Sequence, residues 1–192
     1  MAPLLRALTV GLLLFALCGT SAANEPEARK RGIVGQRAPS WSGVQTWFQL
    51  PAGASGLDIS SFQGKSVVLY GFQSWCPGCH SRGFPTIKAI HEHFSGQDHV
   101  AVVAVQTVFE GFGANTAERA LEDVKRYGLD IPVGHDPGRD GRGSVIMKRY
   151  RSGGTPWIIL IDPEGVVRYN HFRIQPAKAI SMIEGWSSKG PH

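Results

Sequence analysis

The sequence has few cysteines, and it lacks several features that would point to a function directly. Its 192 residues contain three cysteines, Cys18, Cys76 and Cys79, which is too few for a disulfide framework. No expected strand is followed by a Gly-x-Gly-x-x-Gly loop, so the usual binding site for a nicotinamide or flavin dinucleotide is excluded. Repeats and low-complexity tracts are also absent.

Long apolar runs are absent too, apart from one at the N-terminus. Arg6 precedes the apolar run 7–17, and the small residues 19–23 follow it. This order is typical of a secretory signal peptide, with cleavage expected after Ala23. The run is short for a membrane span, which needs about 20 residues. No charge lies between Arg6 and Glu25, so an uncleaved N-terminal anchor is the alternative. We expect a periplasmic or otherwise exported protein.

Beyond the predicted signal peptide, residues 1–23, the composition indicates one domain with two tails. We expect residues 24–35, where acids and a basic run at 29–31 lie together, to form a flexible tail. Residues 36–186 would form the domain, and residues 187–192 a flexible C-terminal tail. The net charge is +5, but the other basic residues are scattered along the chain. After an export signal, this distribution argues against nucleic acid as a partner.

The order of apolar segments predicts an α/β domain with a central mixed β-sheet flanked by helices. We expect strands at 66–72, 99–107, 157–161 and 166–169, a short strand or edge at 131–134, and helices at 77–94, 115–127, 144–150 and 176–186. Pro85 interrupts the first helix, so a kink near Phe84 is expected. Asn115 and Glu118 are the predicted capping pair of the second helix.

Cys76 and Cys79 lie three positions apart, where a predicted strand leads into a predicted helix. This spacing allows a small disulfide or a shared metal ion. A purely structural disulfide is the weaker interpretation, because so short a loop restrains little of the unfolded chain. The N–H groups and dipole of the helix N-terminus favour an anion, so the pKa of Cys76 should be lowered. Cys79, one turn on, should be more buried, with a pKa nearer its ordinary value.

Three short motifs stand out: Trp-Cys-Pro-Gly-Cys at 75–79, Gly-Gly-Thr-Pro at 153–156 just before a predicted strand, and the Asp-Pro-Glu-Gly turn at 162–165. They resemble the motifs of the thioredoxin fold. Together with the signal sequence and segments 36–39 and 57–65, they make the chain resemble the exported TlpA/ResA-type thioredoxin-like disulfide reductases. The resemblance covers nearly all of the predicted mature chain and implies a thioredoxin-like fold.

The resemblance also implies roles for the cysteines and for the Thr-Pro element. Cys76 would attack a substrate disulfide, and Cys79 would resolve the mixed disulfide that forms. The bond between Thr155 and Pro156 would be cis and face the cysteines, and the backbone of Thr155 would pair with an extended substrate segment. For Pro156 the alternative is a plain proline at the start of a strand.

Three further residues belong to the predicted site. Trp75 would form one wall of it, and ordinary core packing is the alternative. Pro77 and Gly78 remove one N–H and one side chain from the loop between the thiols, so a partner's backbone can approach.

Two positions depart from the family pattern, and both concern the proton of Cys79. Tyr70 stands where ordinary thioredoxins have a buried acid, and Arg82 stands where the exported reductases often have a glutamate. The candidates left for proton transfer are His80, next to Cys79, and Glu110, at the end of the second strand. For His80 the alternative is a solvent-exposed helix residue, and for Glu110 it is a loop carboxylate.

The predicted function is that of an exported thiol-disulfide oxidoreductase that acts as a protein disulfide reductase without metal or organic cofactor. Its partners would be a disulfide-bearing protein substrate and a protein thiol donor, which could be membrane-bound. One alternative is a peroxiredoxin-like peroxide reductase, although Leu69 and Gln73 replace the proline and threonine usual before such a cysteine. A second is a copper carrier that uses Cys76, Cys79 and His135, although such carriers usually space their cysteines by four.

Overall fold

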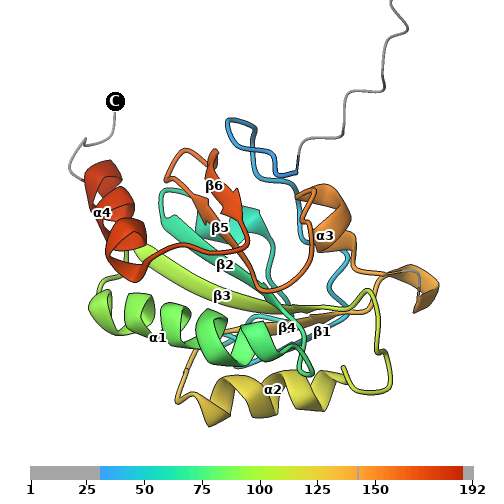
Figure 1. Ribbon diagram of the computed structural model, residues 1–192. Coiled ribbons are helices and arrows are strands. Elements are labelled where there is room, and N and C mark those ends of the chain that lie inside the picture. Colours follow the sequence, from blue (N-terminus) through green and yellow to red (C-terminus); the bar gives the residue numbers. More distant parts are fainter. Residues whose placement is uncertain (1–30, 142, 188–192) are drawn as a thin grey trace, which may run out of the picture.

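The sheet at the centre of the fold has six strands and helices on both faces (Figure 1). The computed structural model describes residues 31–141 and 143–187, so the predicted signal peptide lies outside the described residues. The strands are β1 (Thr46–Phe48), β2 (Ser66–Phe72), β3 (Val100–Thr107), β4 (Val133–Asp136), β5 (Trp157–Ile161) and β6 (Val167–His171). The helices are α1 (Phe84–His93), α2 (Ala117–Arg126), α3 (Val145–Arg149) and α4 (Pro176–Ser187), with 3₁₀ turns η1 (Ile59–Phe62) and η3 (Arg139–Gly141) and a π-helix η2 (Cys79–Gly83).

The sheet is mixed, as predicted, and its order is β1-β4-β3-β2-β5-β6. Strands β2, β3 and β4 are parallel, while β1, β5 and β6 pair antiparallel with their neighbours. Among the described residues, no helix has both the length and the apolar character needed to cross a membrane.

Every residue of β2 is buried, because the strand has a packed layer on each of its faces. Val68, Tyr70 and Phe72 belong to the core beneath α1, α2 and α4, whereas Val67 and Leu69 belong to a second core that includes residues of α3. The alternating side chains of the strand therefore supply both cores, as the unbroken apolar run predicts.

This topology brings two distant segments to one edge of the sheet. The parallel strands end there, so the chain leaves β2 and enters the cysteine loop at this edge. Strand β5 is antiparallel to β2 and begins there, with Trp157 opposite Gly71. The loop after Phe72 and the turn before Trp157 therefore meet, although about 80 residues separate them in sequence.

The packed domain begins earlier than predicted. The prediction assigns residues 31–35 to a flexible tail, but the Gly32 N–H donates to the Arg151 carbonyl and the side chain of Ile33 is buried in the second core. Ile33 can be buried because this segment lies against the chain between α3 and β5. Strand β1 was also missed, since three half-buried residues give no clear periodicity.

The first helix has a π-helical segment where the sequence predicted a proline kink. The Phe84 N–H donates to the Cys79 carbonyl, five residues back, which is the π-helical pattern. Pro85 has no N–H to continue the regular ladder, and α1 resumes with Pro85 in its first turn. The irregularity thus falls within the helix that carries the cysteines.

The predicted cap of α2 is wrong by one residue. Thr116 is the N-cap, and its side chain accepts a hydrogen bond from the Arg119 N–H. Asn115 is instead buried, with hydrogen bonds to the loop that leads to the cysteines. A threonine can replace an asparagine as a cap, which leaves Asn115 free for that contact.

Candidate active site

The side chain of Cys76 lies at the start of the first helix with its sulfur close to Thr155. The residue is only 7% exposed. Its Sγ accepts a hydrogen bond from the Cys79 N–H at 3.3 Å and lies 3.6 Å from the Thr155 carbonyl oxygen. The hydrogen bond from the Cys79 thiol lowers the pKa of Cys76 to about 6, against the opposing effect of burial. At neutral pH most Cys76 side chains are therefore thiolates, the form that attacks disulfides.

Cys79 is fully buried, and its thiol has the opposite character. Burial raises the pKa of Cys79 far above that of an ordinary thiol, and the neighbouring Cys76 adds to the effect. The two cysteines thus differ as the predicted division of labour requires. The pKa of Cys79 departs from the prediction, which placed it near its ordinary value, because the side chain lies within the core rather than at the solvent edge.

The Thr155–Pro156 element faces the cysteines, and its peptide bond is cis. Gly78 and Gly83 both lie against the ring of Pro156. A Cβ atom at Gly78 would lie 3.3 Å from Pro156 Cδ, and one at Gly83 would lie 3.0 Å from Pro156 Cβ. The proline therefore packs directly on the start of the helix that carries the cysteines. A side chain would be tight at Gly78 and would overlap its neighbours at Gly83.

Trp75 lies at the surface and not in the core, so ordinary core packing does not describe it. It is 48% exposed. Its indole ring lies over Gly111, where a Cβ atom would be 3.1 Å from the ring. Phe109 and Phe112 in the same loop are also exposed. Trp75, Phe109 and Phe112 thus present apolar side chains to solvent in the cysteine loop and in the loop after β3, a common feature of surfaces that bind proteins.

Asn115 anchors the loop before Cys76, a role that the sequence reasoning missed. Its Oδ1 accepts from the Ser74 N–H at 2.7 Å. Its Nδ2 group lies within hydrogen-bond distance of the Gln73 side chain and of the Glu110 and Gly111 carbonyls. One buried amide thus ties the cysteine loop to the loop that follows β3. The sequence gives no distinct signal for this role, because an asparagine just before a helix is also a common N-cap residue.

The structure does not bring His80 or Glu110 into contact with the thiol of Cys79. The ring of His80 lies 2.6 Å from the Ser74 carbonyl through Nε2 and 3.1 Å from the Tyr127 hydroxyl through Nδ1. The Glu110 carboxylate has no hydrogen-bond or ion-pair partner within residues 31–141 and 143–187, and the residue is exposed. His80 is half-buried, so the alternative of a solvent-exposed helix residue does not describe it either.

The hydroxyl that reaches Cys79 belongs to Tyr70. It donates to the Cys79 carbonyl at 3.2 Å and also interacts with the Cys79 thiol. Burial raises the pKa of Tyr70 well above its ordinary value, so the phenol stays protonated. Tyr70 can therefore orient the Cys79 segment, but it is a poor base.

His135 does not join the cysteines. Its Nδ1 lies 2.6 Å from the side-chain amide of Gln106, which also contacts the Ser74 hydroxyl. Burial lowers the pKa of His135, so it is neutral at pH 7. Among the described residues, no group of three or more His, Cys, Asp or Glu side chains could hold a metal ion. The ligand set of the copper-carrier alternative is thus not assembled in this part of the chain.

The low pKa of Cys76 predicts how its reactivity depends on pH. As pH rises through about 6 the thiol loses its proton, so alkylation of Cys76 should speed up and level off above neutral pH. The rate can be followed by iodoacetamide labelling and mass analysis. Replacing Cys79 by alanine removes the main cause of the shift, so the midpoint should move upward. A wild-type midpoint near the ordinary value of about 8.5 would contradict the prediction.

Comparisons with known proteins show the family to which the chain belongs. A sequence model of the family described as Redoxin matches residues 33–183. The thiol-disulfide oxidoreductase ResA of Bacillus subtilis (strain 168) is 29% identical over 161 residues, 82% of this chain and 79% of that protein. Human nucleoredoxin is 26% identical over 120 residues, which cover 62% of this chain but only 25% of that protein.

Two solved structures are similar over most of their length. A thioredoxin-like superfamily protein is 33% identical with a TM-score of 0.71, covering 81% of this chain and 97% of that one. A thiol-disulfide isomerase from Corynebacterium glutamicum is 30% identical with a TM-score of 0.67, covering 79% and 96%. The thioredoxin-like fold implied by the motifs is thereby confirmed.

Proposed function

This chain belongs to the Redoxin family, and we propose that it works as an exported protein disulfide reductase through a cycle of Cys76 and Cys79. It is a thiol-disulfide oxidoreductase, as its relatives are named. The observation that carries the finer proposal is the contrast between the two thiols. Cys76 is a thiolate beside the Thr155–Pro156 element, and Cys79 is a protonated thiol within the core.

The first step forms a mixed disulfide. The Cys76 thiolate attacks one sulfur of the substrate disulfide, and the other substrate sulfur leaves as a thiolate that takes up a proton from water. An extended substrate segment would pair with the backbone of Thr155, next to the attacking sulfur. The aromatic surface of Trp75 would cover the opposite side.

The second step releases the substrate. Cys79 gives up its proton to water and attacks Cys76 Sγ. The Cys76–Cys79 disulfide forms, and the second substrate sulfur leaves as a thiolate that takes up a proton from water. Two electrons have then passed from the enzyme dithiol to the substrate. In the mixed disulfide Cys76 is no longer charged, so one of the causes that raise the pKa of Cys79 disappears, while burial remains. A protein thiol donor must then reduce the enzyme disulfide.

The reduction potential of the cysteine pair tests the direction of this cycle. We expect a value on the order of −250 mV, as for thioredoxin-type reductants. The purified protein would be equilibrated in thiol–disulfide buffers, and free thiols counted by alkylation and mass. A value near −120 mV would make the protein an oxidant and overturn the reductase assignment. Consumption of hydrogen peroxide by the reduced protein would favour the peroxide-reductase alternative instead.

Export rests on the predicted signal peptide. Its basic start, apolar run and small residues supply the three parts that such a signal needs. Expression of the full chain in a host with a periplasm, followed by N-terminal sequencing, tests this part separately. A new N-terminus after Ala23 is expected. Retention of the leader in the membrane fraction would favour the uncleaved anchor.

A further inference from the structure

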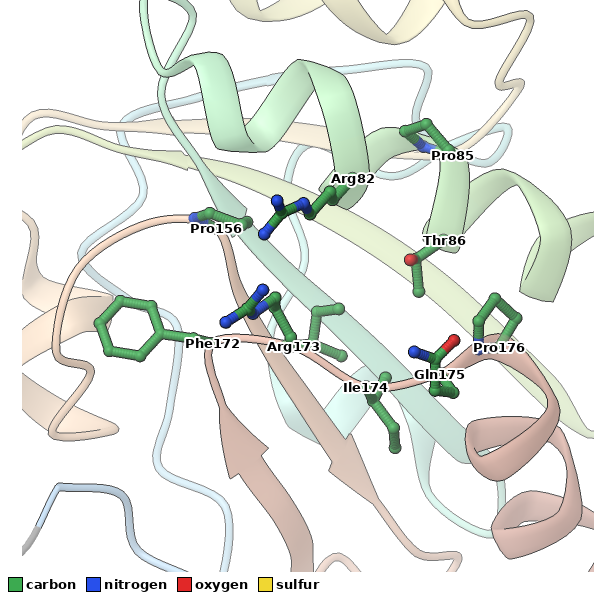
Figure 2. A pocket seen from close by; sticks show the side chains of 11 residues that line it. Arg82, Pro85, Thr86, Pro156, Phe172, Arg173, Ile174, Gln175 and Pro176 are labelled. Atoms are coloured by element: carbon green, nitrogen blue, oxygen red, sulfur yellow. The ribbon is translucent and has the colours of Figure 1, made fainter.

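A pocket of about 510 Å³ lies beside Pro156, between the first helix and the segment that joins β6 to α4 (Figure 2). Arg82, Phe172 and Arg173 line it together with Pro156. A smaller pocket of about 250 Å³ is lined by the same four residues and extends to Gly78, in the loop between the two cysteines. The two pockets together run from Gly78, in the loop between the cysteines, along Pro156 to the start of α4.

The charge on the walls of this pocket is of one sign. Arg82 and Arg173 are both exposed, and neither guanidinium has a hydrogen-bond or ion-pair partner in the part of the chain that the structure describes. No Asp or Glu is among the residues that line either pocket. In Figure 2 both guanidinium groups lie on the Pro156 side of the pocket.

Some other cations do have such a partner: Arg168, Lys88 and Arg126 each lie within ion-pair distance of a carboxylate. Two arginines that share one pocket without a carboxylate repel each other, and an incoming anion would relieve this repulsion. A guanidinium binds a carboxylate through paired N–H donors. The guanidinium groups of Arg82 and Arg173 are therefore suited to bind a carboxylate of a ligand.

We propose that Arg82 and Arg173 form a carboxylate-binding subsite for an Asp or Glu side chain near the disulfide of a protein substrate. The inference rests on the proposed function and adds the chemical class of its substrate. A polypeptide is the expected occupant because the subsite continues along apolar residues, Phe172 and Ile174, away from the thiol. The ring of Trp75, the residue before Cys76, is also exposed. A segment bound at the site could thus meet aromatic surface as well as positive charge.

The test compares disulfide peptides that differ in one residue. Glutamate is placed at successive positions on either side of the peptide's cysteine, and each peptide is matched with its glutamine form. For the best position, we expect kcat/KM of the wild-type enzyme to be about tenfold higher with glutamate than with glutamine. The preference should shrink as salt is added.

Variants of the two arginines assign the preference to the subsite. Arg82→Gln and Arg173→Gln should each lower the glutamate-to-glutamine ratio, and the double variant should bring it close to one. The ratio is the readout because Arg82 lies near Cys76, and its loss could slow every peptide alike. Lys65→Gln is the matched control, since it removes a positive charge just before β2, at the opposite end of that strand, and should leave the ratio unchanged.

The outcomes separate the inference from the proposed function. If the wild type reduces all peptides at equal rates, the subsite is wrong and the reductase assignment stands. If the double variant keeps the preference for glutamate, another group binds the carboxylate, and the proposed subsite is again overturned. Equally fast reduction of oxidised glutathione, a small disulfide that carries carboxylates, would overturn the assignment to a polypeptide. If no peptide or protein disulfide is reduced, the proposed function fails and the inference fails with it.

Discussion

Replacing Cys76 by serine is expected to lower disulfide turnover by about a thousandfold or more. A serine hydroxyl is not ionised at neutral pH, so the nucleophile of the first step is lost. Cys79 cannot replace it, because its side chain is fully buried and its pKa is raised. Turnover can be measured as reduction of insulin disulfides with a chemical thiol as the donor.

The companion variant Cys79→Ser should behave differently. The first step remains, so a mixed disulfide between Cys76 and the substrate should accumulate, and mass analysis should detect it as a covalent adduct that excess thiol releases. The variant Cys76→Ser should form no adduct. Turnover retained by Cys76→Ser but lost in Cys79→Ser would reverse the roles of the two cysteines.

Much of the fold could be predicted because its strands have strong signals. The run at 66–72 is apolar on both faces and is the central strand β2, with the predicted bounds. Strand β5 also has its predicted bounds. The failures occur where the signal is local and weak. Strand β1 has only three half-buried residues, and the start of the domain depends on the burial of Ile33, a long-range contact that no local pattern indicates.

Part of the candidate site could be predicted, because the spacing of some of its residues along the chain forms recognisable motifs. The positions of Cys76, Cys79 and Pro156 follow from short motifs at the ends of strands. The partners of Cys79 do not, since they depend on which side chains cross the core. Tyr70 comes from the strand beneath and reaches the Cys79 carbonyl. Arg173 likewise reaches the site from a loop almost 100 residues further along the chain.

Substituting Gly83 by alanine should destabilise the protein by about 2–3 kcal/mol, through overpacking. A Cβ atom at this position would lie 2.1 Å from the Tyr70 hydroxyl and 2.8 Å from the ring carbon that bears it. Tyr70 is fully buried and cannot swing away without disturbing the core. Alanine normally stabilises a helix by about 1 kcal/mol relative to glycine. A net loss of stability in Gly83→Ala would therefore have to come from the steric overlap with Tyr70. Urea unfolding of the reduced protein measures the change.

A control in another helix separates this overlap from helix propensity. Gly185 is exposed in α4, and a Cβ atom there would meet nothing within 4 Å. Gly185→Ala should therefore leave stability unchanged or raise it by up to about 1 kcal/mol. Equal effects of the two glycine substitutions would contradict the overlap.

The tyrosine itself supplies the sharper test. Tyr70→Phe removes the oxygen that the new Cβ atom would strike, and alone it should cost about 1 kcal/mol through the lost hydrogen bond to Cys79. The Cys79 carbonyl keeps the Phe84 N–H as a partner. The double variant with Gly83→Ala should then be more stable than the sum of the two changes predicts, by about 1 kcal/mol. Strict additivity would mean that the two positions do not compete for space. Coupling would show that the tyrosine beneath Cys79 fits only because position 83 has no side chain.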